Sequence, residues 1–366
     1  MSDGITEGII DKLSALPNVK VISRTSAFHY KQRDIEPKKV ARELGVEALV
    51  IGRVIQRGDD LSVSAELVDA HEDKQLWGEQ YSRKLADTAS LQQEIASAIS
   101  GNLRLRLTSE DKTRMAKSAT NPEAYQLYLK GRYLSNQSTA EGLKKGIEYF
   151  QQAIDKDPSY AMAYVGLADS YNWLGAGLNY ESPSETLPKA KAAARKALEL
   201  DDLLGEAHAA QAYVQWFYDR DWPSAEREFK RAIELNPNSA ISHERYAECL
   251  FTRTRFDEGI DEIKRAQELD PIQTQELGGL AHVYLLMHRY DESISNFQKA
   301  LDLYPKMRHS FALSWLGHTR PKACTRKLLP STTKWPGPTR VSQLRTSWLL
   351  TVSAGSTPSR ADGLLR

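Results

Sequence analysis

The segment RAIELNPNSA (231–240) returns 34 residues later as RAQELDPIQT (265–274) and once more as KALDLYPKMR (299–308). In each copy an alanine lies five residues before a proline. A related copy, QAIDKDPSYA, stands earlier in the chain at 152–161. A fixed interval of this length predicts an array of similar supersecondary units, each stacked on its neighbours, rather than one closed core.

The spacing inside each unit predicts two packed helices. One stripe has the form leucine, small residue, tyrosine at i, i+1 and i+4, as in Leu280, Ala281 and Tyr284. A second stripe has the form small, bulky, small at i, i+4 and i+7, as in Ser293, Phe297 and Ala300. Both are helical periods. Small residues let the helices approach closely, and the proline ends the second helix before the next unit begins.

These units resemble the tetratricopeptide repeat. The resemblance covers 121–306 as five repeats, and 307–319 starts a sixth. It implies an all-α solenoid in which the first helix of each repeat lines the inner, concave face. The second repeat carries an insertion, WLGAGLNYESPSETLP (173–188), which we expect to be a loop at the edge of the solenoid.

Residues 1–107 predict an α+β domain. An apolar stripe at helical spacing runs from Ile5 to Leu16, and EPKKVARELG (36–45) is a second helix. VKVIS (19–23) is a predicted strand. EALVIGRVIQ and LSVSAELVDA flank the turn RGDD as a hairpin, KQLWGEQYSRKL adds a third strand, and 90–107 is a closing helix.

The stretches SDGITEGII, VISRTSAF, ELGVEALVIGRV and LWGEQYSRKL make this domain similar to the TolB amino-terminal-like domain. Relatives usually begin with one more strand, so we expect an edge of the sheet to lack its partner here. Many relatives carry a kinase, cyclase or winged-helix domain upstream, together with a membrane span, and place this part outside the cytoplasm. Residues 108–120 are the expected linker to the repeats.

Charge separates the C-terminal segment from the rest. The chain has a net charge of +1, yet residues 307–366 hold ten Lys or Arg and the single acid Asp362. Residues 320–366 are rich in Ser, Thr and Pro without a helical stripe. Three interpretations stay open: a disordered tail, a basic tail that contacts nucleic acid or another anionic surface, or a reading-frame shift near Arg320.

The sequence holds no catalytic motif and no paired-cysteine metal spacing, so we expect no enzyme activity and no cofactor or metal. His243 and His208 occupy stripe positions one repeat apart, which indicates packing. No signal peptide is recognisable, and no apolar run is long enough to span a membrane. The sequence therefore predicts neither an enzyme nor a membrane-spanning protein, and it leaves the cellular location open.

A binding surface is the expected functional site. In the tetratricopeptide arrangement the side chains that point to the inner face are those of Tyr128, Arg132, Asp169, Asn172, Tyr213, Trp216, Glu244, Glu248, Phe251 and His282. Trp216 and Phe251 either anchor a partner or cover the core of the next repeat. The Lys, Asn and Arg set that clamps a peptide carboxylate in some relatives is absent, and Glu244 with Glu248 favours a basic partner.

The predicted function is therefore a bacterial protein-protein interaction scaffold that binds a peptide or protein rather than a small molecule. The alternative is the accessory part of a signalling kinase or adenylate cyclase whose catalytic domain lies upstream.

Overall fold

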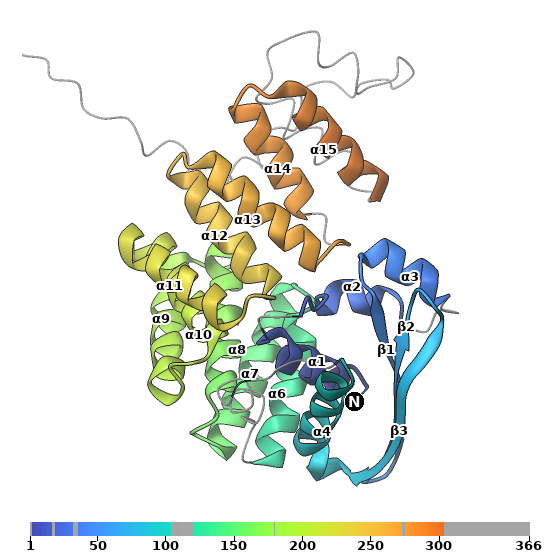
Figure 1. Ribbon diagram of the computed structural model, residues 1–366. Helices are drawn as coiled ribbons and strands as arrows, with labels where there is room; N and C mark the ends of the chain where they lie inside the picture. The colour runs from blue at the N-terminus through green and yellow to red at the C-terminus, as the bar shows by residue number, and fades with distance from the viewer. Residues whose placement is uncertain are drawn as a thin grey trace, which may run out of the picture.

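The computed structural model describes residues 2–16, 19–31, 36–103, 108, 121–178, 180–272 and 275–303. An α+β region at the N-terminus is followed by a helical array (Figure 1). The expected linker beyond Thr108, the start of a sixth repeat at 307–319 and the tail at 320–366 lie outside these residues.

The sheet has three antiparallel strands in the order β1 (Ala48–Arg57), β2 (Asp60–Asp69) and β3 (Lys74–Lys84), as the sequence predicts. The inward side chains of β2 are buried, in the predicted alternation: Leu61, Val63, Ala65 and Leu67. Helices α1 (Ser2–Ser14) and α4 (Thr88–Asn102) pack on that face. The other edge of β1 pairs with no described strand.

Helix α3 (Pro37–Leu44) starts at its predicted proline and ends at Gly45, whose φ of 62° suits a residue without a Cβ. The predicted strand at 19–23 is wrong, and the sequence analysis missed α2 (Arg24–His29) directly after it. The N–H of Val21 donates to Asn238 Oδ1 over 3.2 Å, and that of Ser23 donates to the Leu269 carbonyl over 2.8 Å. These backbone N–H groups therefore donate to residues of the helical array instead of to a neighbouring strand.

Residues 122–303 form five helix pairs, which the 34-residue pattern predicts. The pairs are α6 (Pro122–Ser135) with α7 (Ala140–Lys156), α8 (Ala161–Asn172) with α9 (Pro183–Leu200), α10 (Gly205–Val214) with α11 (Trp222–Leu235), α12 (Ala240–Thr252) with α13 (Phe256–Leu269), and α14 (Gln275–Leu286) with α15 (Tyr290–Leu303). We call the first helix of each pair an inner helix and the second an outer helix.

Close packing between the helices requires the small residues of the pattern. Phe150 is fully buried between two glycines, and a Cβ placed on Gly131 or Gly166 would lie 2.7 or 2.5 Å from its ring. The equivalent Phe229 is also fully buried, as are Ala225 and Ala232, the small residues of the same stripe. The small, bulky, small stripe thus forms the contact within and between pairs.

The insertion in the second repeat is more helical than the expected loop. A π-helical turn, Trp173–Gly177, extends α8, and α9 already begins at Pro183. Proline suits the first turn of a helix because its missing N–H has no intrahelical partner there. The second half of the insertion is therefore the beginning of α9, and only a short link separates the two helices.

The N-terminal region packs directly on the helix pairs. Asn238, which is 4 % exposed, donates from Nδ2 to the carbonyls of Ser14 and Leu16 over 3.0 and 3.1 Å. Ser26 Oγ donates to Asp270 Oδ1 over 2.5 Å. Asn238 and Asp270 lie in the turns that follow the outer helices α11 and α13. The N-terminal region is thereby fixed against the array at several points (Figure 1).

Candidate functional site

The predicted inner-face residues come from successive inner helices of the array: Tyr128 and Arg132 from α6, Asp169 and Asn172 from α8, Tyr213 from α10 and Trp216 from the π-helical turn Gln215–Asp219 after it, Glu244, Glu248 and Phe251 from α12, and His282 from α14. The side chain of His282 lies outside what the structure describes. The others fall into four environments.

Residues of α6 contact the N-terminal region. The guanidinium of Arg132 pairs with Glu7 of α1 and donates to the Tyr128 hydroxyl over 2.7 Å. Glu7 is 4 % exposed and also faces Arg24 Nε at 3.3 Å. Next to this group, Tyr125 donates to Gln92 of α4 over 2.6 Å. The inner side of the first pair is thus occupied by another part of the same chain.

A second group, here called the cross-repeat cluster, joins three helix pairs. It consists of Asp169, Tyr213, Glu244, Arg245 and Glu248, whose charges act on one another. Arg245 Nη1 donates to Asp169 Oδ1 over 2.8 Å, and its guanidinium carbon lies 5.1 Å from the Tyr213 ring centroid. The side chain of Arg245 is only 5 % exposed. The sequence analysis missed this arginine.

Two carboxylates of the cluster have no hydrogen-bond or ion-pair partner among the described residues. Glu244 and Glu248 are half-buried on α12. Burial raises the pKa of Glu244 to about 7, against the opposing charge of Arg245. Burial and the neighbouring Glu244 raise the pKa of Glu248 to about 8. The inner helix of the fourth pair therefore holds two carboxyl groups that are poorly solvated and unpaired.

The aromatic residues of the third group pack inside the array. Trp216 is 4 % exposed and donates from Nε1 to Thr252 Oγ1 over 3.2 Å. Its ring meets Tyr213 edge to face at 5.4 Å. Phe251 packs against the core of the next pair, close to Gly259. These contacts favour the core-covering interpretation for Trp216 and Phe251.

Asn172 lies at the end of α8 and is 1 % exposed, yet neither Nδ2 nor Oδ1 has a partner among the described residues. It stands three residues after Asp169, so the two side chains share a face of the helix. A buried amide without a partner is costly and uncommon in folded proteins.

Both histidines considered above bridge an inner helix, an outer helix and a turn, which agrees with the predicted packing role. His243 Nδ1 lies 2.6 Å from Glu262, and Nε2 lies 3.2 Å from the Pro237 carbonyl. No group of three or more potential metal ligands occurs among the described residues. Within the same residues, no helix is both long and apolar enough to cross a membrane.

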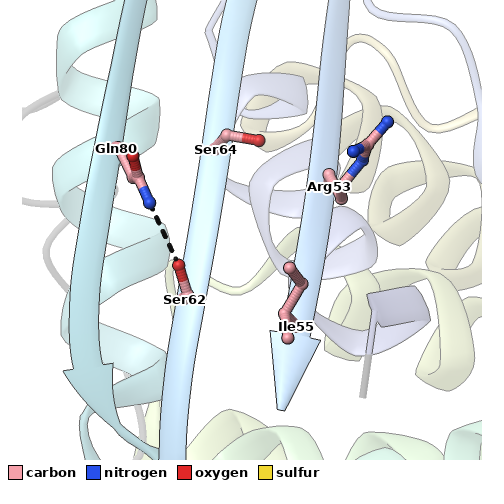
Figure 2. Close-up of a pocket in the computed structure, with 5 residues that line it drawn as sticks. All are labelled: Arg53, Ile55, Ser62, Ser64 and Gln80. Carbon is pink, nitrogen blue, oxygen red and sulfur yellow. Dashed lines mark hydrogen bonds between the residues drawn. The ribbon is translucent and has the colours of Figure 1, made fainter.

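The outer face of the sheet carries an open depression lined by Arg53, Ile55, Ser62, Ser64 and Gln80 (Figure 2). Gln80 Nε2 donates to Ser62 Oγ over 3.3 Å across the strands. The lining side chains are exposed or half-buried, and none of them is a buried polar group that lacks a partner. The inner face, in contrast, holds the buried and unpartnered Asn172, so we regard it as the better candidate for a binding site.

Comparison with known proteins finds tetratricopeptide repeats in the chain. One tetratricopeptide-repeat model matches residues 217–271 and another matches 277–307. The chain is 31 % identical over 214 residues to the putative adenylate cyclase 3 of Rhizobium meliloti (strain 1021), a match that covers 57 % of this chain and 35 % of that protein. The chain thus spans about a third of that relative's length.

Similar solved structures include two tetratricopeptide-repeat proteins. TTC0263 of Thermus thermophilus is 20 % identical, with 53 % of this chain and 99 % of that chain covered at a TM-score of 0.44. YrrB, described as having an unusual peptide-binding site, is 22 % identical, with 53 % and 92 % covered at a TM-score of 0.36.

Proposed function

We propose that this chain is a non-enzymatic interaction scaffold that binds a peptide or protein on the inner face of its helix pairs. Repeats of this type are typically protein-binding scaffolds rather than enzymes. The observation that carries the proposal is the state of the inner face between α8 and α12. There, half-buried carboxylates and a buried amide lack partners within the described chain.

The proposed binding residues are those of the cross-repeat cluster together with Asn172 and His282. Tyr128 and Arg132 contact the N-terminal region, so their proposed role is to hold that region beside the binding surface. Trp216 and Phe251 are proposed to support the binding surface indirectly, by packing in the core beneath it.

For residues 1–107 we propose a TolB amino-terminal-like domain, and for the whole chain a role in a bacterial signalling or sensor system. The similarity to a putative adenylate cyclase is compatible with the alternative that this chain is the accessory part of a catalytic signalling protein. In both cases the activity proposed for the described residues is binding.

The test is a selection from a random 12-residue peptide library displayed on phage, with the full chain as bait. Selected peptides would be resynthesised with a photoreactive residue and crosslinked, and the attachment sites would be mapped by mass spectrometry. We expect attachment to α8, α10 and α12. Failure to enrich any peptide, or attachment confined to the outer helices, would overturn the proposal.

A further inference from the structure

One edge of the sheet, the edge of β1 that faces away from β2, is long and unprotected. β1 is ten residues long, pairs with β2 along its whole length without a register shift, and has no described strand on its other side. It contains no proline, and its charged residues are Arg53 and Arg57. Natural sheets usually protect such an edge with a bulge, a proline, lysines or a covering element, because an open edge pairs with another chain.

The opposite edge, formed by β3, does carry protective features. β3 has a bulge against β2, at which Leu76 is the extra residue. It begins and ends with the exposed lysines Lys74 and Lys84, and Glu79 and Arg83 lie between them. Bulges and lysines discourage the pairing of an edge with another strand. The two edges are therefore unequal, and β1 is the edge at which a further strand fits.

Backbone hydrogen-bonding groups line this free edge. Just before β1, the Glu47 carbonyl accepts from the Ala70 N–H over 2.9 Å, so Glu47 bonds toward the β2 side. Alternate residues of an antiparallel strand bond to opposite sides. The odd-numbered residues of β1 therefore bond to β2, and the N–H and C=O groups of its even-numbered residues, from Ala48 to Gln56, point to the free edge. A strand paired there would form about ten hydrogen bonds with β1.

Apolar side chains beside the free edge are also uncovered. Val50 lies opposite Leu67 on the core-facing side of the sheet, yet it is 43 % exposed, whereas Leu67 is 1 % exposed. On the outer face, Ile55 is 47 % exposed and lies on the same strand as Arg53 (Figure 2). A neighbouring strand buries side chains of this kind through cross-strand pairs. Both faces of β1 thus favour a partner strand with aliphatic residues.

The sequence of β1 is complementary to itself. In an antiparallel pair of two copies with Gly52 opposite Gly52, aliphatic residues meet on both faces: Val50 with Val54, and Leu49 with Ile55. Ile51 meets Arg53, whose methylene stem covers apolar surface. Each of these contacts occurs twice because of the two-fold symmetry. The pair would therefore cover the exposed apolar side chains of both copies.

Charge complementarity selects this register. It places Glu47 opposite Arg57 of the second copy at both ends of the pair, and neither residue has an ion-pair partner among the described residues. With the axis at Arg53 instead, two arginines would lie directly opposite each other, which is destabilising. With the axis at Ile51, Glu47 would face no cation. Of these three registers, the one centred on Gly52 alone pairs opposite charges.

We propose that β1 pairs antiparallel with β1 of a second copy of this chain, about a two-fold axis at Gly52, so that two three-stranded sheets become one sheet of six strands. The chain is then a homodimer, and the dimer carries two helical arrays. Two binding surfaces in one particle raise the apparent affinity for a partner that has two binding sites. This inference stands independently of the proposed scaffold function, because it uses only the sheet.

The experiment measures the self-association of the full chain by sedimentation velocity at concentrations up to about 100 µM, which reveals a dimer with a Kd of about 10 µM. The variant V50K places a charge inside the proposed interface. L76K replaces a side chain of the same 43 % exposure on β3 and is the matched control. Circular dichroism checks that each variant is folded.

An exchange of charges tests the register. E47R and R57E each place like charges opposite each other, whereas E47R/R57E restores opposite charges, but only if Glu47 faces Arg57 of the second copy. We expect a dimer for the unmodified chain and for L76K, and a dimer at least about tenfold weaker for V50K. E47R and R57E should each weaken the dimer about fivefold, and the double variant should return to within about twofold of the unmodified chain.

Hydrogen exchange gives a second readout at the edge itself. In the dimer, the amides of Val50 and Val54 should exchange more slowly as the protein concentration rises. A chain that stays monomeric at all concentrations, or a dimer that V50K leaves unchanged, would overturn the proposal. A monomer in which these amides are protected would show that another segment of the same chain covers the edge, and would overturn it as well.

Two further outcomes would contradict the assignment to β1 in this register. A dimer that V50K weakens, but in which E47R/R57E is no stronger than the single variants, would pair its strands in another register and overturn the axis at Gly52. A dimer that L76K weakens as much as V50K would respond to added charge in general, and would overturn the assignment of the interface to β1.

Discussion

Arg245 on α12 donates to Asp169 on α8 over 2.8 Å, and so joins the second and fourth helix pairs across the third. Tyr213 of the intervening helix α10 lies against the guanidinium. In a solenoid, contacts normally link neighbouring repeats only. This ion pair therefore couples repeats that would otherwise unfold with little mutual influence.

Replacing Arg245 with methionine should be strongly destabilising. The variant keeps much of the side-chain volume but leaves the Asp169 carboxylate without its ion-pair partner, and breaking a buried pair costs about 3–5 kcal/mol. We expect a loss of about 3 kcal/mol in urea unfolding followed by circular dichroism. Arg265→Met, at an exposed pair with Glu268, should change stability by less than about 0.5 kcal/mol. Equal effects of the two substitutions would contradict this account.

Asn238→Ala should loosen the N-terminal region from the array. The substitution removes two donors to the carbonyls of Ser14 and Leu16 and one acceptor for the N–H of Val21. Leaving buried groups unpaired costs about 1–3 kcal/mol, so we expect a loss of roughly 2 kcal/mol and faster hydrogen exchange at Val21. Asn102→Ala, at an exposed helix end, is the control. Unchanged exchange at Val21 would refute the role assigned to Asn238.

Local sequence predicted the helix pairs because their stripes and prolines act within one repeat. It predicted the hairpin strands for the same reason, since alternation and the turn at Gly58 are local features. It missed the contacts of Asn238, which in NPNS looks like an ordinary turn residue. Its partners lie 222 and 224 residues away, so no local pattern could indicate them. The strand predicted at 19–23 is wrong for the same reason, because the partners of Val21 and Ser23 are also distant in the sequence.

The candidate site shows the same limit. Helical register assigned Asp169, Tyr213, Glu244 and Glu248 to successive inner helices, and in the structure the charges of these residues act on one another. It could not show that Arg245, which directly follows the predicted inner-face residue Glu244, also turns toward the cluster. That orientation depends on Asp169, 76 residues earlier, and on the rings beside it. Helical register therefore indicates which residues lie on the inner helices, but not which of their charges are paired.

The unpaired carboxylates predict an unusual pH dependence. An unfolded glutamate ionises near pH 4.3, whereas the pKa of Glu248 in the folded chain is about 8. The unfolded state thus loses its proton first, and the folded state loses stability as the pH rises between these values. E244Q/E248Q should remove this dependence and raise the unfolding free energy at pH 8.5 by roughly 2 kcal/mol, with little effect at pH 5.

Urea titrations of both proteins at several pH values would measure this difference. A double variant that is less stable than the unmodified chain at pH 8.5 would mean that the carboxylates have stabilising partners. A gain in stability on replacing charged side chains is typical of functional residues.

The ionisation of His208 should also make the stability depend on pH. Its Nδ1 lies 2.6 Å from Glu228 and its Nε2 lies 2.9 Å from the Asp202 carbonyl, so both ring nitrogens face acceptors and the ring is best bound when doubly protonated. Burial lowers the pKa of His208, but the bonds to Glu228 and Asp202 outweigh it and the net pKa is raised. The bond from His208 in turn lowers the pKa of Glu228, against burial.

A raised histidine pKa means that the stabilisation is fully present below the unfolded value, about 6.5, and is lost as the pH rises through the folded value. His208→Gln should therefore cost roughly 1.5 kcal/mol at pH 6, the contribution of a hydrogen bond to a charged group, and clearly less at pH 8.5. His71→Gln, at an exposed turn, is the control variant in the same measurement. Urea unfolding at the two pH values measures both, and a cost for His208→Gln that is independent of pH would mean that the ring is neutral in the folded chain.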